Sequence, residues 1–199
     1  MRFGAVICAA GGGTRMGQNK ALCRLSANET FLSSIVSSIR RVDRVAPIAV
    51  VVGAQAERVI DAHEDLDVSW IENRNWETTH MLDSLMLGIS AIEPGHDILH
   101  WPVDCIGILP SDIEMLLHVP TASLAVLSFR GVPGHPLRLS ASKADWLRQH
   151  AAEFSSLKEV IHSDARVFVE SQTYALMNCN TPEMLADFLA HRKNEKFLK

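Results

Sequence analysis

The stretch FGAVICAAGGGTRMGQNK, residues 3–20, decides how this chain folds and where its chemistry lies. Its first half is an apolar run, typical of a strand that is buried on both faces of a sheet. Its second half is rich in glycine and carries Arg15 and Lys20. Glycines remove side chains from a turn, so backbone N–H groups can converge on a polyphosphate while the two cations neutralise its charge. The stretch therefore predicts a phosphate-binding loop at the end of a strand.

This loop differs from two common phosphate-binding patterns. A Walker loop has Gly-Lys-Ser or Gly-Lys-Thr after a short spacer, and a dinucleotide fingerprint reads Gly-x-Gly-x-x-Gly directly into a helix. Here GGG at residues 11–13 is followed by TRMGQNK at residues 14–20. An ordinary glycine-rich turn with a solvated Arg15 and Lys20 is the alternative interpretation.

The string AAGGGTRMGQNK at residues 9–20 resembles the signature of the MobA-like nucleotidyltransferases, Ala-Ala-Gly-x-(Gly/Ser)-x-Arg-Met-Gly-x-x-Lys. The resemblance implies that the loop wraps a nucleoside triphosphate and that Arg15 and Lys20 are catalytic, stabilising charge as pyrophosphate leaves. The Ala-Ala-Gly start is most similar to the molybdenum cofactor cytidylyltransferase-like branch, which implies CTP as the donor. The nucleotide-binding residues implied in this way are Ala9, Ala10, Gly11, Gly12, Gly13, Thr14, Arg15 and Lys20.

Length and composition bound the class of protein. The chain has 199 residues, of which 47% are hydrophobic, and a formal net charge of −4. We expect one core and hence a single nucleotidyltransferase domain over residues 1–199. A weakly acidic chain lacks the charge pattern for nucleic acid or an anionic membrane, so a small molecule is the expected partner. The four cysteines show no Cys-x-x-Cys spacing, and we expect reduced thiols in a cytoplasmic protein.

Short apolar runs alternate with amphipathic patterns along the chain. Runs rich in Val, Ile, Leu and Ala predict strands at 3–9, 48–53, 68–72, 98–102 and 124–129. Helical spacing of apolar residues predicts helices at 31–42, 55–63, 81–92 and 112–117. Pro94-Gly95 and Pro133-Gly134 predict turns. The alternation favours a single-domain, three-layer α/β/α sandwich with a mainly parallel sheet, and the resemblance implies its Rossmann-like, nucleotide-diphospho-sugar transferase-like form.

Asp104 comes just after the predicted strand at 98–102. Ligands of such sheets bind beyond the carboxyl ends of the strands, so we expect Asp104 and the glycine loop to face one cleft. A carboxylate there suits Mg²⁺, which takes one or two carboxylates together with substrate phosphates. Relatives read Pro-x-Asp-x-Pro at this point, which implies that Asp104 is a catalytic metal ligand, although Ile106 replaces the second proline. A turn or helix-capping aspartate is the plainer alternative.

The second metal ligand departs from the family pattern. Relatives commonly carry Asp-x-Asp-Thr-Pro-Glu-Asp, in which the Asp before Thr-Pro completes the metal site, whereas this chain reads NCNTPEM at residues 178–184. The resemblance implies that Asn180 is the metal ligand through its carbonyl oxygen, with a weaker hold on the metal than a carboxylate would give. Asn-Thr-Pro-Glu is also a conventional helix start, so a helix-capping role of Asn180 stays open and is compatible with ligation.

The residues that would bind the acceptor follow the family pattern less closely than the glycine loop does. The segment GVPGHPL at residues 131–137 resembles the Gly-x-x-Gly-His-Pro segment of the cytidylyltransferase branch, which implies that His135 binds the acceptor. The fit of Ser84 to the same branch gives it an acceptor-binding role as well. His80 stands where glycine is expected and would strain a backbone that needs glycine, and Asp83 puts negative charge near the acceptor. The plainer alternatives are a structural His135 and a helix N-terminal Asp83.

The motifs together favour a Mg²⁺-dependent nucleotidyltransferase. It would move a nucleoside monophosphate from a nucleoside triphosphate, CTP first, to a phosphorylated acceptor such as a molybdopterin-type cofactor, with release of pyrophosphate. A partner enzyme that receives the product fits this activity. Two alternatives stay open: a sugar-phosphate nucleotidyltransferase of the same fold, and a chaperone-like, nucleotide-binding relative without turnover.

Overall fold

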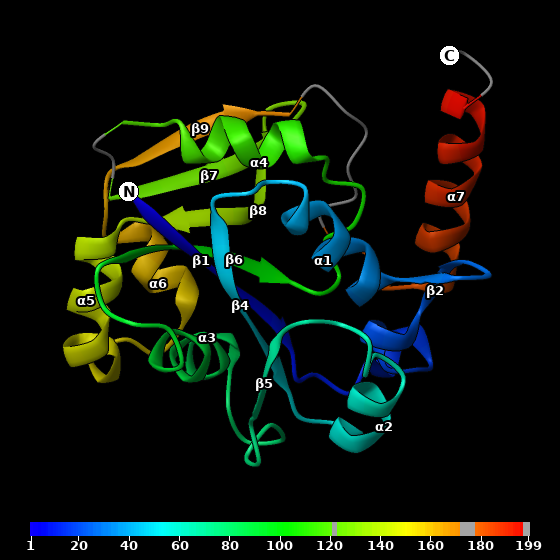
Figure 1. Ribbon diagram of the computed structural model, residues 1–199, viewed down its shortest axis with the longest axis horizontal. Coiled ribbons are helices and arrows are strands. Elements are labelled where there is room, and N and C mark those ends of the chain that lie inside the picture. Colours follow the sequence, from blue (N-terminus) through cyan, green and yellow to red (C-terminus); the bar gives the residue numbers. More distant parts are fainter. Residues whose placement is uncertain (121–122, 172–177, 197–199) are drawn as a thin grey trace.

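A computed structural model describes residues 1–120, 123–171 and 178–196, which form a seven-stranded sheet with helices on both faces (Figure 1). The strand order is β5-β4-β1-β6-β8-β7-β9, from the bottom to the top of the view in Figure 1. Neighbouring strands are parallel except at β8, which runs antiparallel to β6 and β7. The strands are β1 (Arg2–Ala9), β4 (Val45–Val52), β5 (Ser69–Glu72), β6 (His96–Pro102), β7 (Leu124–Phe129), β8 (Val132–Leu139) and β9 (Arg166–Glu170), and a small separate pair joins β2 (Arg24–Ser26) to β3 (Glu29–Thr30).

Strand β1 holds the middle of the sheet. Every residue of β1 after Arg2 is buried, as its apolar sequence predicts. It pairs in parallel with β4 on one side and β6 on the other, and the ladders reach the pairs Ala9↔Val52 and Cys8↔Pro102. Because these strands end together, the segments that follow them emerge at one edge of the sheet.

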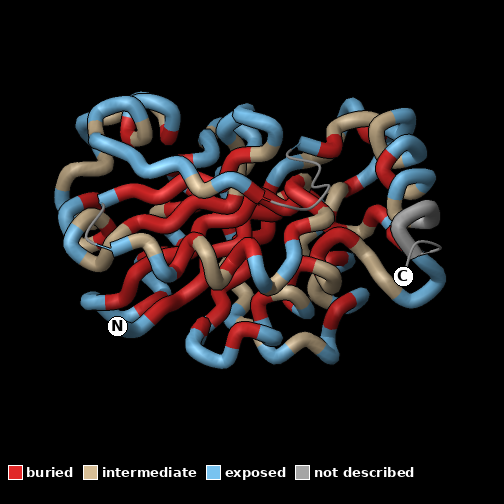
Figure 2. Tube along the Cα trace, turned by 90° about the horizontal axis from the view of Figure 1, so that it is seen from above, coloured by how far each residue is buried: buried red, intermediate tan, exposed pale blue. Residues whose placement is uncertain are grey.

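The helices cover both faces of the sheet and form the outer two layers. Alternate side chains of a strand point to opposite faces, so Ile7 of β1 joins one apolar cluster and Val6 joins the other. The buried trace therefore runs through the middle of the molecule, with exposed segments outside it (Figure 2). The first cluster is completed by α1 (Phe31–Arg40), α2 (Ala56–Asp61), α4 (Pro110–Leu117) and α7 (Pro182–Lys196), and the second by α3 (Met81–Ser90), α5 (Ala141–His150) and α6 (Leu157–His162).

Helix α1 shows how local sequence sets these elements. The side chain of Thr30 accepts a hydrogen bond from the Ser33 N–H at 3.1 Å, and the Ser33 hydroxyl accepts one from the Thr30 N–H at 2.9 Å. This reciprocal cap satisfies N–H groups that the first turn of a helix leaves unpaired. The apolar residues then recur at helical spacing and bury one face of α1 against the sheet.

The fold class and the predicted elements are confirmed, with ends shifted by a few residues. The prediction of a turn at Pro133-Gly134 is wrong, because both residues lie inside β8. The turn of the β7–β8 hairpin lies earlier, at Arg130 and Gly131, which have positive φ values of 52° and 75° and suit a two-residue hairpin loop. Pro94-Gly95 does form a turn, just before β6.

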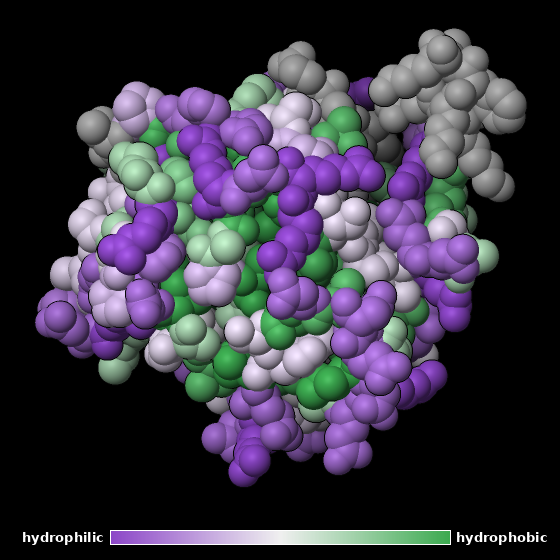
Figure 3. All heavy atoms as spheres, in the orientation of Figure 1, coloured by the Kyte–Doolittle hydropathy of each residue, from purple (hydrophilic) through white to green (hydrophobic). Residues whose placement is uncertain are grey.

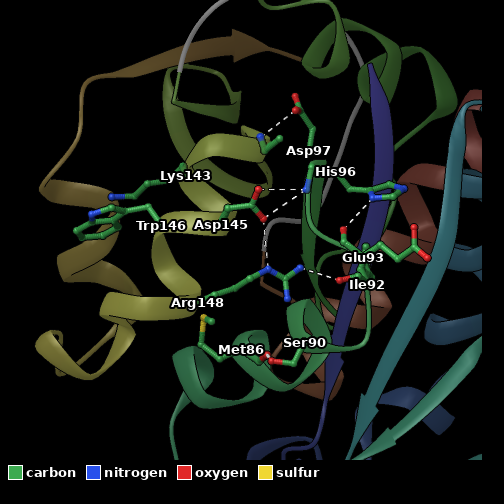
Figure 4. Close-up of polar contacts among 12 residues, drawn as sticks. Met86, Ser90, Ile92, Glu93, His96, Asp97, Lys143, Asp145, Trp146 and Arg148 are labelled. Atoms are coloured by element: carbon green, nitrogen blue, oxygen red, sulfur yellow. Dashed lines mark hydrogen bonds and ion pairs between the residues drawn. The ribbon is translucent and has the colours of Figure 1, made fainter.

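Helix α5 is tied to the start of β6 by polar contacts (Figure 4). Asp145 accepts a hydrogen bond from the Gly95 N–H at 3.1 Å and pairs with Arg148 at 3.3 Å. Asp97 accepts one from the Ala141 N–H, at the first residue of α5, at 2.9 Å. Carboxylates at a helix N-terminus satisfy free N–H groups and complement the helix dipole. These contacts fix α5 at the end of the sheet opposite the glycine loop.

The molecular surface is mixed in character. On the face seen in Figure 3, apolar residues show mainly in the middle of the view and hydrophilic residues toward its margins. No helix among the described residues is both long and apolar enough to cross a membrane.

Candidate active site

The glycine loop leaves the end of β1 and turns sharply at Gly13. This residue has a φ of 66°, and a Cβ atom on it would lie 2.0 Å from the carbonyl oxygen of Gln18. Both the positive φ and the close backbone approach require glycine here. Gly17, with a φ of 73°, ends the short 3₁₀ turn Thr14–Met16 that carries Arg15. The loop conformation therefore follows from its glycines.

Asn19 clamps the loop, and sequence reasoning missed it. Its side chain is buried, accepts a hydrogen bond from the Ala21 N–H at 3.0 Å and donates one to the Ala54 carbonyl at 2.7 Å. A signal was available, because asparagine is a preferred residue just before a helical turn, and the 3₁₀ turn Lys20–Leu22 begins immediately after it. The clamp fixes the backbone from which Lys20 projects.

The Lys20 ammonium lies between two oxygen atoms from distant parts of the chain. Its Nζ donates to Asp104 Oδ2 at 2.8 Å and to Asn180 Oδ1 at 2.6 Å. Arg15 Nη2 also donates to Asn180 Oδ1, at 3.1 Å. The Lys20 and Asp104 side chains are each 17% exposed, so this ion pair is far less screened than a surface pair. The structure thus brings all four predicted charged or metal-binding residues into one network.

Two backbone contacts position the oxygen atoms. The Val103 N–H donates to the Cys8 carbonyl at 3.0 Å, which continues the β1–β6 pairing as far as Asp104. The Cys179 N–H donates to the Asp104 carbonyl at 2.8 Å and brings Asn180 alongside. Sequence reasoning missed the role of Cys179, because a backbone donor leaves no mark in the residue type.

A cavity of about 180 Å³ opens beside this network. Its charged lining consists of Arg15, Lys20 and Asp104, so two cations face one carboxylate and the cavity favours an anionic ligand. Burial raises the pKa of the Cys8 thiol to about 12, so this lining residue stays protonated and is no nucleophile. The other lining residues are Gly11, Gly13, Thr14, Met81, Pro102 and Val103.

Ala9, Ala10 and Gly12 of the predicted loop lie behind this lining. Ala9 and Ala10 are buried, and the Ala10 carbonyl accepts a hydrogen bond from the Ala54 N–H at 2.9 Å. A Cβ atom on Gly12 would meet the Trp76 ring at 3.4 Å. These residues hold the loop against Ala54 and Trp76.

The oxygens of Asp104 and Asn180 form a donor pair for a hard cation. Both oxygens contact the same ammonium nitrogen, so they converge on one cation-sized position. Carboxylate and amide oxygens are the ligand types that Mg²⁺ accepts, with its other positions left to water and phosphate. Within the described part of the chain, no three His, Cys, Asp or Glu side chains gather into a closed metal cage. The residues present therefore fit an open Mg²⁺ site that substrate would complete.

Asn180 is not the cap of the helix that follows it. The side chain of Thr181 accepts the hydrogen bond of the Met184 N–H at 3.4 Å, and α7 begins at Pro182. The side chain of Asn180 instead contacts Arg15, Lys20 and the Asn178 carbonyl. The predicted helix start is confirmed, and its cap lies one residue later than Asn180.

The start of α3 is ordinary helix geometry. His80 has a φ of −110°, so glycine is not needed there and the expected strain is absent. Asp83 accepts a hydrogen bond from the His80 N–H at 2.7 Å, which confirms its role as a helix N-terminal acid. Ser84 is buried and accepts a hydrogen bond from the Asn73 amide at 3.1 Å. Ser84 is thus not among the residues that line the cavity.

His135 is not among the residues that line the cavity, and it contacts a second histidine. Its ring meets that of His100 edge to face, with centroids 5.2 Å apart. Burial lowers the pKa of His135 to about 4, and the nearby charge of Asp104 opposes the shift only in part. Burial also lowers the pKa of His100, with a further contribution from His135. Both rings are therefore neutral at physiological pH.

The fold and the cavity define an α/β/α protein with a glycine loop and a cation position at the carboxyl edge of its sheet. The profile of the MobA-like NTP transferase domain matches residues 5–167. The chain belongs to this family, whose members are nucleotidyltransferases, and is accordingly placed among these enzymes.

Solved structures share the fold. A nucleotidyl transferase from Methanothermobacter thermautotroptrophicus is 22% identical, with a TM-score of 0.78 over 96% of this chain and 97% of that one. Rv0371c from Mycobacterium tuberculosis H37Rv, in complex with manganese, is 18% identical, with a TM-score of 0.73 over 96% and 99%. CMP:2-keto-3-deoxy-manno-octonic acid synthetase, complexed with CTP, is 16% identical, with a TM-score of 0.77 over 98% and 100%. No curated protein sequence matches the chain significantly.

We predict that Gly13→Ala destabilises the protein, whereas Gly11→Ala does not. A Cβ atom at position 13 would lie 2.0 Å from the Gln18 carbonyl oxygen, and the backbone there has a positive φ. A Cβ atom on Gly11 would have no neighbouring atom within 4 Å. The positive φ alone costs about 1–2 kcal/mol, so the free energy of unfolding should fall by at least that much in Gly13→Ala. Urea unfolding followed by circular dichroism measures both variants. Equal stabilities would show that the loop does not need its observed conformation.

We predict that acid weakens the fold through His135. Between pH 6.5 and about 4 the unfolded chain binds a proton at His135 that the folded protein does not bind. The free energy of unfolding therefore falls as the pH falls through this window, by up to about 1.4 kcal/mol per pH unit from this group. His135→Gln should reduce the slope in urea unfolding at pH 4.5 to 7. The exposed His162 supplies the control His162→Gln, and an unchanged slope in His135→Gln contradicts the prediction.

Proposed function

We propose that this chain is a Mg²⁺-dependent nucleotidyltransferase, in one domain over residues 1–199, that transfers a nucleoside monophosphate to a phosphorylated small molecule. CTP is the proposed donor, a molybdopterin-type cofactor the proposed kind of acceptor, and pyrophosphate the second product. One observation carries the proposal: the Lys20 ammonium, Asp104 and Asn180 meet beside a glycine loop. The complexes of similarly folded proteins with CTP and with manganese support it.

The glycine loop and its cations would bind the triphosphate. Backbone N–H groups of the loop provide donors, and Arg15 and Lys20 provide positive charge. A triphosphate offers Lys20 new oxygen partners, so Asp104 and Asn180 would be released from the ammonium as the nucleotide binds. Asp104 and Asn180 would then hold Mg²⁺, which supplies charge neutralisation to the phosphates when bound.

Arg15 and Lys20 would act on the leaving group. Negative charge grows on pyrophosphate as the bond to the α-phosphorus breaks, and cations preset near it stabilise that charge without reorganisation. No protein nucleophile is required, because a phosphate oxygen of the acceptor attacks the α-phosphorus itself. The contribution of the chain is therefore positioning and electrostatics.

His135 would face the acceptor side as a neutral imidazole. It is electrostatically close to Asp104, and its low pKa leaves it able to exchange hydrogen bonds without adding charge. Ser84 accepts a hydrogen bond from the Asn73 amide. Through this contact it would shape the start of α3.

One feature favours a competing function, a nucleotide-binding protein without turnover. Asn178 and Asn180 stand where relatives carry acids, and Asp104 is the one carboxylate among the described residues that line the cavity. A sugar-phosphate nucleotidyltransferase would share the site and differ in its nucleotide and acceptor.

Two measurements separate these functions. Calorimetric titration with CTP, GTP, UTP and ATP, each with and without Mg²⁺, identifies the donor. Pyrophosphate release is then followed with molybdopterin-type and sugar 1-phosphate acceptors. Metal-dependent CTP binding with release supports the proposal, whereas binding without release for any acceptor identifies a binding protein, and binding of no nucleotide contradicts both.

We predict that Lys20→Ala and Asp104→Ala each lower pyrophosphate release at least about 100-fold, the usual effect of removing a preset electrostatic group. Circular dichroism should confirm an intact fold in each variant. Arg41→Ala is the matched control, because it removes an exposed cation at the end of α1 and should keep the wild-type rate. A near-normal rate in either test variant removes that residue from the mechanism.

We predict that Asn180→Asp tightens Mn²⁺ binding in the presence of CTP, about tenfold, because a full charge replaces a neutral ligand oxygen. Electron paramagnetic resonance titration of free Mn²⁺ measures this without turnover. Asn178→Asp is the control, since it makes the same charge change at an exposed position two residues away. Equal effects of the two variants would show that Asn180 is no ligand.

A further inference from the structure

Strand β9 forms an edge of the sheet on the side away from the active site. It is the last strand in the order, and no other strand among the described residues pairs with its outer side. In Figure 1 it lies at the upper margin of the sheet. An open edge presents a row of backbone groups that can pair with another chain, and natural proteins usually protect such edges.

Large apolar side chains are exposed in the middle of this edge, between the charged residues Arg166 and Glu170. Phe168 is 50% exposed and Val167 is 42% exposed, in the middle of β9. Val132, in the neighbouring hairpin, is 63% exposed. These residues are among the most exposed large apolar side chains of the described protein. Val167 and Phe168 are consecutive and therefore expose apolar surface on both faces of the edge strand.

The sequence of β9 is complementary to itself. It reads RVFVE, so reversal of direction brings Arg166 opposite Glu170, valine opposite valine, and Phe168 opposite Phe168. Two antiparallel copies would therefore form two opposite-charge pairs on either side of an aromatic pair. Directly opposed residues of these types stabilise a sheet, whereas like charges destabilise it.

The backbone groups of β9 that such a pairing needs point to the outer edge of the sheet. The Ser171 N–H donates to the Ser128 carbonyl of β7 at 2.8 Å, and the Val169 carbonyl accepts from the Ser128 hydroxyl at 3.3 Å. Because successive residues of a strand point their backbone groups to opposite sides, the even-numbered residues of β9 point theirs to the outer edge. An antiparallel partner centred on Phe168 would thus meet it as a hydrogen-bonded pair.

We propose that β9 pairs antiparallel with β9 of a second copy of this chain, about a twofold axis at Phe168. The partner is a second copy because the charge pattern of β9 is complementary to its own reverse, so that two identical antiparallel strands satisfy every charged position. A twofold contact of one patch with itself closes on two subunits and covers the β9 edge of both. The two sheets become one continuous sheet, with the two nucleotide cavities far from the contact.

Both charged residues have partners within the subunit, and the pairing would add to these contacts. Arg166 Nη1 donates to the Ile161 carbonyl at 3.2 Å, and the Glu170 carboxylate accepts from the Ser128 hydroxyl at 2.5 Å. Arg166 and Glu170 are both exposed. Hydrogen bonds from Ser128 and Gly131 lower the pKa of Glu170, so its carboxylate is ionised at neutral pH. Arg166 lies over the ring of Phe168, 5.7 Å from its centroid. The pairing would therefore bring Arg166 of the second copy to a carboxylate that Ser128 and Gly131 already hold.

Charge reversal tests the proposal. Sedimentation velocity over a range of concentrations should show a dimer for the wild type. Arg166→Glu and Glu170→Arg should each raise the dissociation constant at least about tenfold, because like charges replace both opposite-charge pairs. An equimolar mixture of the two variants should form a heterodimer, seen by native mass spectrometry, because every charge pair in it is again opposite.

Phe168→Glu places like charges at the twofold axis and should give a monomer. Leu87→Gln, which changes an apolar residue of α3 that is 38% exposed, is the control and should leave the dimer intact. The proposal is overturned by a monomeric wild type at every concentration. It is also overturned by a dimer that survives both charge reversals, or by variants that fail to associate when mixed although circular dichroism shows them folded.

Discussion

The parallel pairing of β1 with both β4 and β6 is the constraint on which the rest of this structure depends. It buries β1 completely and ends three strands at one edge of the sheet. The glycine loop and Asp104 both follow strands that end there, so their meeting is a consequence of strand order. The helices on either face then cover apolar side chains that the sheet already presents.

The Lys20 ammonium is the electrostatic centre of the site. It contacts Asp104 and Asn180, which lie far from it in the sequence and come from segments after β6 and before α7. An ion pair with this little exposure needs its partners in place, since removing one leaves a charge that is poorly solvated. The same contacts hold the side-chain oxygens of Asp104 and Asn180 close to one nitrogen atom. Binding of a triphosphate would exchange one set of Lys20 partners for another.

The parts of the site that depend on local sequence lie at the strand ends where the sequence placed them. The loop at residues 11–13 and the acid Asp104 are set by glycine geometry and by position after a buried strand. The predictions that the structure corrects depend on contacts between residues that are distant in the sequence. The turn assigned to Pro133-Gly134 lies inside β8 because the hairpin register with β7 determines where that turn falls. The helix-capping role that the sequence left open for Asn180 belongs to Thr181, because Lys20 and Arg15 engage the Asn180 side chain.

The sequence by itself determined the alternation of strands and helices, the glycine loop and the candidate residues, since glycine, burial and charge act within a few neighbouring positions. Only the tertiary structure decided that Lys20 lies between Asp104 and Asn180, that Ser84 is taken up by Asn73, and that β9 ends the sheet. Each of these depends on contacts between segments that are distant in the chain. Such contacts follow from strand order and packing, which no local pattern encodes.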